Sequence, residues 1–499
     1  MGDSRAHRTR IWRWMAVVLA FAIVAAACGD DDEEPASQPE APAEEPSAAP
    51  DPEAEAPAEE PEAPAEEPEP EAPAEEPEAP AEEPEPEPEP EEPAEEPEPE
   101  PEPQPLTASY RGVTEDSISV GVLLIDKDLL FEVAGVLLNW GDNVAQYQEA
   151  IDAVNEAGGV NGRLIEPVYE LVNPLSPTAY DESCVKLTQD EQIFAAIGFV
   201  RPSDAALCYA EINDTPFIGY LSDVTSQVTD RSVLPIITSN ALPERMDGAL
   251  ATTVAATGAL DGKTIAVLGN SDARNGLVVS ALAGLGYDVA STTVTAVPTE
   301  DEAADAAELD IVIQRWIADG IDFVFDTAGL DRPLAAANRA GFEADWATNR
   351  TTVLSASRFD SGATEAEIAR TMVVAVPSVE LIYEQGHGPT VACVDRWNQN
   401  NPDEQAVFYP GEDDLDNLQR IARSCQQVGT FARIAELAGP DLTTESFAAA
   451  LAEVGSYEIA ELPFASLGAG KWDANDVVTL FRWDSGLGDF VAGDFVDIG

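Results

Sequence analysis

Short hydrophobic runs alternate with helical patterns along most of the chain. Residues 118–125 (ISVGVLLI) are almost continuously hydrophobic and rich in branched side chains, as in a strand buried on both faces of a parallel sheet. Over residues 147–154, apolar side chains recur at the spacing of one helix face, and Gly158-Gly159 supplies a helix end. This part of the chain therefore predicts a β-strand followed by an α-helix.

The alternation continues through two series of elements. The first series has strands at 164–171, 193–199 and 216–221, and helices at 180–189 and 204–211. The second has strands at 264–268, 288–295, 323–326 and 352–355, and helices from 243 to about 258 and at 276–284, 304–318 and 333–340. The chain ends with a hydrophobic stretch at 372–377, helices at 388–399 and 415–438, and strands at 477–483 and 489–496. Strands separated by helices of this length form parallel, doubly wound sheets, so the two series predict two α/β lobes.

Two motifs in this pattern resemble a known family. Residues 150–165 (AIDAVNEAGGVNGRLI) resemble the first helix and the following turn of type I periplasmic binding proteins, the branched-chain amino-acid-binding family of ABC importers. The paired glycines can adopt the backbone conformation that ends a helix, and the Asn-Gly pair can adopt the one that a tight turn requires. Residues 468–473 (GAGKWD), followed by a strand and Trp483, are similar to the family's final hairpin. The resemblance covers residues 114–499.

The resemblance implies two doubly wound parallel-sheet lobes joined by a hinge of three crossovers, with the ligand held in the cleft between them. We place the crossovers near Asn240, Pro377 and Phe464. The N-terminal lobe then comprises residues 106–240 and 378–464, and the C-terminal lobe comprises residues 241–377 and 465–499.

The N-terminus has the pattern of an export signal. Four arginines precede an apolar run at 15–24, which is too short to span a bilayer comfortably and ends in Ala25-Ala26-Ala27-Cys28. These four residues resemble a bacterial lipobox, although the family usually has leucine where Ala25 stands. The resemblance implies a signal peptide at 1–27 and lipid on Cys28, with an uncleaved anchor or a plain signal as alternatives. Each of the two main interpretations places the folded region outside the cytoplasm.

Residues 28–105 form an acidic tether in this interpretation. Residues 30–105 hold 33 of the 95 acidic residues and 24 of the 39 prolines, and they contain no Lys, Arg, Gly or aromatic residue. Such a segment cannot bury a core, and we expect a disordered, extended stalk that lifts the lobes away from the lipid.

The charge, the cysteines and the histidine content limit which classes of protein this chain can belong to. The formal net charge of −70 excludes a protein that coats nucleic acid. Beyond Cys28 there are four cysteines, which favour disulfides in an exported chain, and predicted neighbouring helices favour the pairs Cys184/Cys208 and Cys393/Cys425. With His387 the only histidine of the folded region and no catalytic signature, we expect no enzyme, no metal and no cofactor.

Candidate ligand-binding residues follow from the rule that ligands bind beyond the carboxyl ends of parallel strands. The loops after the predicted strands contain Arg201, Ser203, Ser222, Asp223, Asn270, Ser271, Arg274, Thr327, Arg358 and Phe359. Family members that bind amino acids hold the carboxylate with hydroxyls and backbone N–H groups, and the ammonium with an acid and aromatics. Here arginines stand at the loop positions that look equivalent. They bind an anionic or carboxylate-bearing ligand, or they pair with the nearby Asp204, Asp272 and Asp360, and both interpretations stay open.

These observations predict an extracytoplasmic solute-binding lipoprotein. We expect a monomer, lipid-anchored to the outer face of the bacterial cytoplasmic membrane, that delivers a small polar or anionic solute to an ABC permease. A ligand-sensing receptor partner is the main alternative, because the fold alone does not separate transport from sensing. An extracytoplasmic hydrolase is a weaker alternative.

Overall fold

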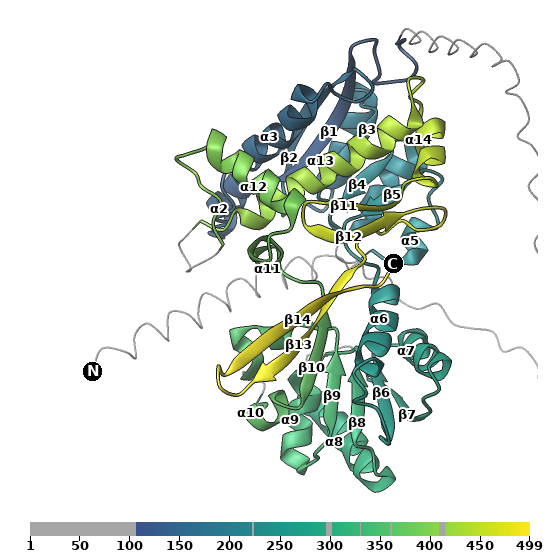
Figure 1. Cartoon of the computed structure of the whole chain (residues 1–499), viewed down its shortest axis with the longest axis vertical. Coiled ribbons are helices and arrows are strands. Elements are labelled where there is room, and N and C mark those ends of the chain that lie inside the picture. Colours follow the sequence, from purple (N-terminus) through teal and green to yellow (C-terminus); the bar gives the residue numbers. More distant parts are fainter. Residues whose placement is uncertain (1–105, 222–223, 296–301, 330, 360–361, 409–414) are drawn as a thin grey trace, which may run out of the picture. The chain divides into compact units, whose positions relative to one another are not determined.

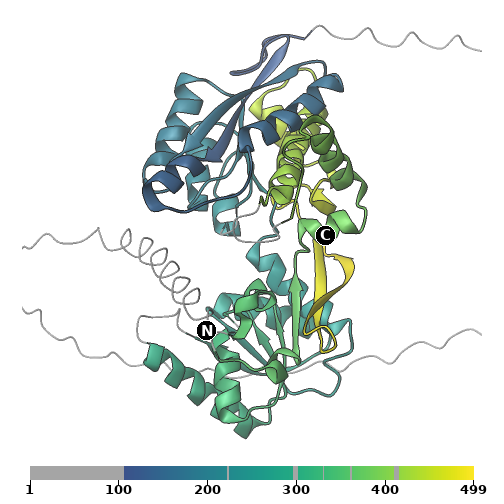
Figure 2. The same ribbon diagram turned by 90° about the vertical axis from the view of Figure 1, so that its left-hand side faces the viewer.

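The computed structural model describes residues 106–221, 224–295, 302–329, 331–359, 362–408 and 415–499. Residues 104–499 form one compact unit, which contains two α/β lobes, each built around its own sheet (Figures 1 and 2). In this part of the chain, no helix is long and apolar enough to cross a membrane. The expected signal peptide, Cys28 and the acidic tether lie outside the described residues, as do Ser222 and Asp223.

The first lobe contains a five-stranded sheet in the order β2-β1-β3-β4-β5, and all neighbouring strands run parallel. Its strands are β1 (Ser117–Ile125), β2 (Leu164–Val172), β3 (Ala195–Gly198), β4 (Phe217–Gly219) and β5 (Ile236–Thr238). Its helices are α2 (Lys127–Ala134), α3 (Asn143–Glu156), α4 (Ala179–Val185), α5 (Ser226–Thr229), α11 (Val379–Glu384), α12 (Gly388–Asn400), α13 (Leu418–Ala438) and α14 (Thr444–Leu451). An antiparallel pair, β11 (Gly455–Ile459) and β12 (Leu462–Leu467), completes the lobe.

Helices cover both faces of this sheet. Val122 of β1 belongs to the core that includes Phe431 of α13, whereas the next residue, Leu123, belongs to the core that includes Tyr180 of α4. Successive side chains of a strand point to opposite faces, so β1 is buried on both sides. This burial explains the almost continuous hydrophobic run at 118–125.

The second lobe contains a seven-stranded sheet in the order β14-β13-β10-β9-β8-β6-β7. Its strands are β6 (Ile265–Gly269), β7 (Val289–Val294), β8 (Phe323–Asp326), β9 (Asp345–Thr348), β10 (Thr371–Ala375), β13 (Val477–Asp484) and β14 (Asp489–Asp497). Its helices are α6 (Pro243–Ala255), α7 (Asp272–Gly284), α8 (Glu302–Asp319), α9 (Asp331–Ala340) and α10 (Glu365–Ile368). The five strands β6 to β10 run parallel, and the final hairpin β13–β14 joins their edge in antiparallel fashion. The predicted fold class is therefore confirmed.

Three chain segments connect the lobes. The first follows β5 and contains Asn240, and the second follows β10 and contains Pro377. The third begins after β12, the strand that contains Phe464 and pairs with β11 in the first lobe. The chain stays in the first lobe's core as far as Ala474 and enters the second lobe's sheet at Val477.

Two predicted elements take another form. The stretch expected as a strand at 352–355 lies in a 3-10 turn, Thr351–Leu354, and the actual strand is β9, just before it. The sequence of β9, Asp-Trp-Ala-Thr, has only a weak hydrophobic pattern, and its pairing with β8 and β10 decides its conformation. The helix expected at 204–211 consists of a 3-10 turn, Ser203–Ala205, and a π-helical turn, Cys208–Ile212.

Both disulfides favoured by the sequence analysis are present. Cys184 of α4 is bonded to Cys208, and Cys393 of α12 is bonded to Cys425 of α13. Each disulfide joins two helical segments of the first lobe.

Candidate functional site

A cavity of about 610 Å³ lies at the carboxyl ends of strands from both sheets. Its lining includes Tyr220 after β4, Asn240 after β5, Arg350 after β9 and Val376 after β10. In open parallel sheets, ligands bind beyond the carboxyl ends of the strands. This cavity, here called the interlobe cavity, is therefore the candidate binding site.

An ion pair forms the first lobe's side of the interlobe cavity. Arg423 of α13 donates to Glu461 through Nη2 at 2.6 Å and through Nε at 3.3 Å. Its guanidinium carbon lies 3.7 Å from the centroid of the Tyr220 ring. Burial alone would lower the pKa of Arg423, but the Glu461 carboxylate outweighs burial and raises it. The pair is charged on both sides and contributes no net charge to the cavity.

The backbone at Glu461 is adapted to this pair. Glu461 lies between β11 and β12 with φ +69°, in the left-handed region that a side chain normally disfavours by about 1 kcal/mol or more. Its N–H donates to the Thr390 hydroxyl of α12 at 3.1 Å. The surrounding structure therefore holds this residue in a strained conformation with its carboxylate on Arg423.

A second cation lies beside this pair. Arg420, one turn before Arg423 on α13, has its guanidinium carbon 3.8 Å from the centroid of the Trp140 ring. Burial, and then the nearby charge of Arg423, lower the pKa of Arg420 to about 10. The first lobe thus brings two arginines and one glutamate close to the cavity.

Asp247 organises the second lobe's side of the interlobe cavity. This residue of α6 is fully buried. Its Oδ2 accepts from Arg274 Nε at 2.7 Å, and its Oδ1 accepts from Arg274 Nη2 at 2.5 Å and from Asn349 Nδ2 at 2.8 Å. Arg274 lines the cavity, and its charge is balanced by a carboxylate behind it.

Arg350 is placed differently from the other two arginines of the lining. Its Nε and Nη2 donate to the Thr327 carbonyl oxygen at 3.1 and 2.7 Å, and its backbone N–H donates to the Thr348 hydroxyl at 3.0 Å. Burial, followed by the charge of Arg274, lowers the pKa of Arg350. The structure thus holds this guanidinium against a neutral carbonyl at the cavity.

Comparison with known proteins identifies the family. Residues 139–486 match the family described as periplasmic binding protein. That match spans more than half of the chain. The chain belongs to the periplasmic binding protein family.

Solved structures share the fold of this periplasmic binding protein. An ABC transporter substrate-binding protein from Desulfitobacterium hafniense, in complex with Leu, is 16% identical with a TM-score of 0.51, and the match covers 76% of this chain and 100% of that one. A putative branched-chain amino acid ABC transporter from Rhodospirillum rubrum is also 16% identical, with a TM-score of 0.52 and the same coverage. No curated protein matches the chain in sequence. At this identity the structures show a common fold, and family membership gives the chain a solute-binding role.

The structure brings one of the predicted binding residues, Arg274, to the interlobe cavity of this binding protein. Arg274 pairs with Asp247 rather than with its sequence neighbour Asp272. Ser271 caps α7, because its hydroxyl accepts from the backbone N–H of Arg274. Thr327 is buried and contributes its carbonyl oxygen to Arg350.

Of the other predicted residues, the five that the structure describes beyond Arg274, Ser271 and Thr327 lie outside the lining. Arg358 is bonded to Asp489 of β14 at 2.6 Å, and its guanidinium lies near the Trp483 and Phe490 rings. In this structure it attaches the final hairpin to the 3-10 turn Ala356–Phe359, outside the lining of the interlobe cavity. Ser203 is buried outside the lining. The side chains that are exposed outside the lining are those of Arg201, Asn270 and Phe359.

Sequence reasoning missed Arg350, Arg423 and Glu461. Arg350 follows β9, so placing that strand correctly would have found it. Arg423 lies within a long helix and Glu461 in a tight turn, and nothing in their local sequence marks them as cavity residues. Only the packing of α13 against the β11–β12 turn brings them together.

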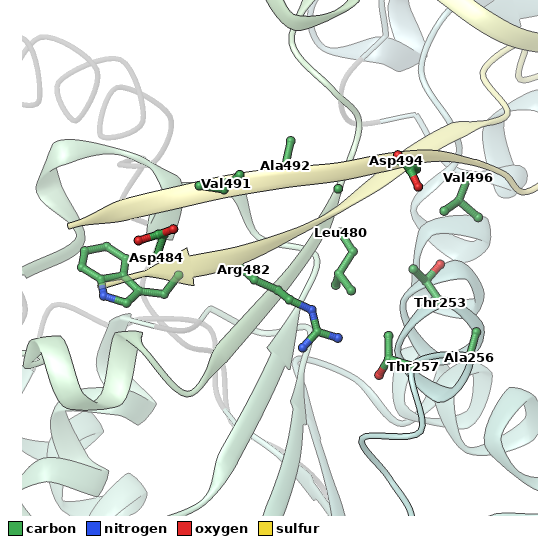
Figure 3. Close-up of a pocket in the computed structure, with 12 residues that line it drawn as sticks. Thr253, Ala256, Thr257, Leu480, Arg482, Asp484, Val491, Ala492, Asp494 and Val496 are labelled. Atoms are coloured by element: carbon green, nitrogen blue, oxygen red, sulfur yellow. The ribbon is translucent and has the colours of Figure 1, made fainter. Parts of the chain in front are cut away.

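A second hollow, of about 510 Å³, lies entirely on the second lobe. Leu480 and Arg482 of β13 border it from one side, and Thr253 of α6 and Thr257, just after that helix, border it from the other (Figure 3). It lies alongside the final hairpin and takes no residue from the first lobe. A ligand there would contact one lobe alone, so it does not fit a site that depends on two lobes.

Proposed function

We propose that this binding protein is an extracytoplasmic, lipid-anchored solute receptor that captures a small polar or anionic solute, such as an amino acid, an amide or a carboxylate, for an ABC importer. The observation that carries the proposal is the interlobe cavity, which takes polar residues from both lobes. The shared fold with the D. hafniense substrate-binding protein supports the ABC partner, and the periplasmic family supports the location.

Ligand capture follows from hinge motion between the lobes. Each lobe has its own cores, so the motion that disturbs the least packing is rotation about the three connecting segments. Arg245 of α6 donates to Asp473 and Asp476 of the third segment at 2.6 and 2.5 Å. The Leu242 N–H of the first segment also donates to Asp473, at 2.9 Å, so these contacts hold the first and third segments together at the start of α6. A solute that touches both walls stabilises the closed arrangement, which the permease then recognises.

The binding role is tested by ligand screening. Native mass spectrometry of the purified full chain, followed by thermal-shift assays with amino acids, amides, dicarboxylates and aromatic acids, should identify a solute that raises the melting temperature. Small-angle scattering of residues 104–499 should then show a smaller radius of gyration with that solute. A chain that binds none of these solute classes would not be a receptor of the proposed kind.

The lipid anchor is tested separately. Cys28→Ser should release the chain from the membrane fraction, because the thiol that carries the lipid is lost. If the variant stays membrane-bound and unprocessed, the anchor is a different one, and the solute-binding role is unaffected.

A further inference from the structure

We propose that the interlobe cavity selects a carboxylate-bearing solute that lacks an ammonium group, with the carboxylate bound to Arg350. This inference rests on the proposed solute-binding function and names the class of solute. It departs from the binding of amino acids, which carry an ammonium group beside the carboxylate.

The balance of charge at the cavity is the first argument. The charged residues in its described lining are Arg274, Arg350, Arg423 and Glu461. Arg423 is matched by Glu461, and Arg274 is matched by Asp247 behind it. Among these described residues, Arg350 is the cation without an ion-pair partner: its guanidinium is bonded to a neutral carbonyl, and the buried carboxylates of Asp326 and Asp247 act on it only through space. From Leu106 onward the chain has 61 acidic and 21 basic residues, so a surplus cation at the cavity is exceptional.

The environment of Arg350 is the second argument. The Thr327 carbonyl fixes the guanidinium through Nε and Nη2, and this leaves Nη1 for a further acceptor. Partial burial and the nearby charge of Arg274 disfavour the charged form of Arg350, and they outweigh the opposite effect of Asp326 and Asp247, so its pKa is lowered. An anion beside the guanidinium would offset both effects. Because the guanidinium is already oriented, it loses little conformational freedom when a carboxylate binds.

The cavity's acids provide the third argument. Glu461 accepts two hydrogen bonds from Arg423, and buried Asp247 accepts three from Arg274 and Asn349. A ligand ammonium that used either carboxylate would have to displace an arginine from it. Removing one partner of a buried ion pair is costly, because the other charge is left unpaired. Binding of a ligand ammonium group to either of these two carboxylates is therefore disfavoured.

The apolar part of the lining provides the fourth argument. Met246, Leu354, Val376, Leu462 and Phe481 also line the cavity. These side chains suit the hydrocarbon portion of a ligand, because burying apolar surface is favourable. The solute class is thus an aliphatic or aromatic monocarboxylate, in preference to an inorganic oxyanion such as phosphate.

Matched ligand pairs test this inference on the full chain. Isothermal titration calorimetry compares leucine with 4-methylpentanoate, phenylalanine with 3-phenylpropanoate, and all four with inorganic phosphate. We expect at least one of the two deaminated acids to bind about 10-fold or more tightly than its amino acid and than phosphate. Arg350→Met should weaken that binding about 10- to 100-fold, the range for losing a hydrogen bond to a charged group, and Arg350→Lys should restore part of it.

Arg482→Met is the matched control. It removes one positive charge from the same lobe, from a side chain beside the second hollow, and should leave the affinity unchanged. Tighter binding of the amino acids or of phosphate, or equal weakening by Arg350→Met and Arg482→Met, would overturn the carboxylate assignment and leave the solute-binding function standing. Absence of binding for these ligands and for every solute class of the wider screen would remove the proposed function as well.

Discussion

The buried pair of Arg423 and Glu461 gives the sharpest stability prediction. Glu461→Gln removes the negative charge and keeps the side chain's size. Glutamine has the same backbone preference as glutamate at φ +69°, so the strain of the turn is unchanged by the substitution. The variant therefore removes the charge and one of the two acceptor oxygens that Arg423 uses, without changing the backbone.

The expected loss follows from the surroundings of Arg423. The Arg423 and Glu461 residues are 5% and 8% exposed, so water cannot replace the missing carboxylate effectively. Breaking a buried ion pair from one side costs about 3 to 5 kcal/mol. The Tyr220 ring still faces the guanidinium and the glutamine oxygen still accepts a hydrogen bond, which favours the low end, about 3 kcal/mol.

Urea unfolding of residues 104–499, followed by tryptophan fluorescence, measures this loss. Arg423→Met in the Glu461→Gln background should recover most of the stability, because it removes the unpaired charge and leaves an apolar side chain. Glu156→Gln is the control, since Glu156 is exposed and pairs with Arg396 on the surface. If Glu461→Gln unfolds at the wild-type urea concentration, or if the two substitutions simply add, the pair does not have the assigned energetic role.

Three further predictions concern stability. Peptide mapping under non-reducing conditions should recover Cys184/Cys208 and Cys393/Cys425, and reduction should lower the melting temperature, since each closed loop is worth about 2 to 4 kcal/mol; crossed pairs or free thiols would contradict the helix placement. The melting temperature should rise from dilute buffer to molar salt, because 61 acidic residues against 21 basic ones repel one another in the folded region, and a salt-independent value would refute this. Burial lowers the pKa of His387, so on acidification the unfolded chain takes up this proton at a higher pH than the folded chain does. The contribution of His387 to the free energy of unfolding should therefore be complete above pH 6.5 and decrease below it, by at most about 1.4 kcal/mol per pH unit. In urea titrations at pH 7.5 and 5.5, His387→Gln should lose less stability than the wild type, and equal losses would show that another group controls this range.

Local patterns in the sequence determined much of the architecture. The hydrophobic run of β1 predicted a strand buried on both faces, and the structure places Val122 and Leu123 in opposite cores. The two glycines at the end of α3 both have positive φ, which other residues rarely adopt, and at Gly159 a side chain would also clash. Gly159 has φ +70°, and a Cβ there would lie 2.1 Å from the Arg163 carbonyl oxygen. Such requirements act within a few residues, so the sequence alone reveals them.

Pairing between distant residues was decided only by the tertiary structure. The sequence offered Asp272 and Asp360 as close partners for Arg274 and Arg358, and the structure gives them Asp247 and Asp489, which are 27 and 131 residues away along the chain. Within the part of the chain that the structure describes, the arginine of the cavity lining that forms no ion pair is Arg350, which follows a strand that the hydrophobic pattern missed. Coulomb interactions depend on distance in space and on burial, and neither is set by position in the sequence. The sequence therefore determined that arginines lie in the loops of an α/β binding protein, and only the packing of helices against those loops decided which arginine remains for the ligand.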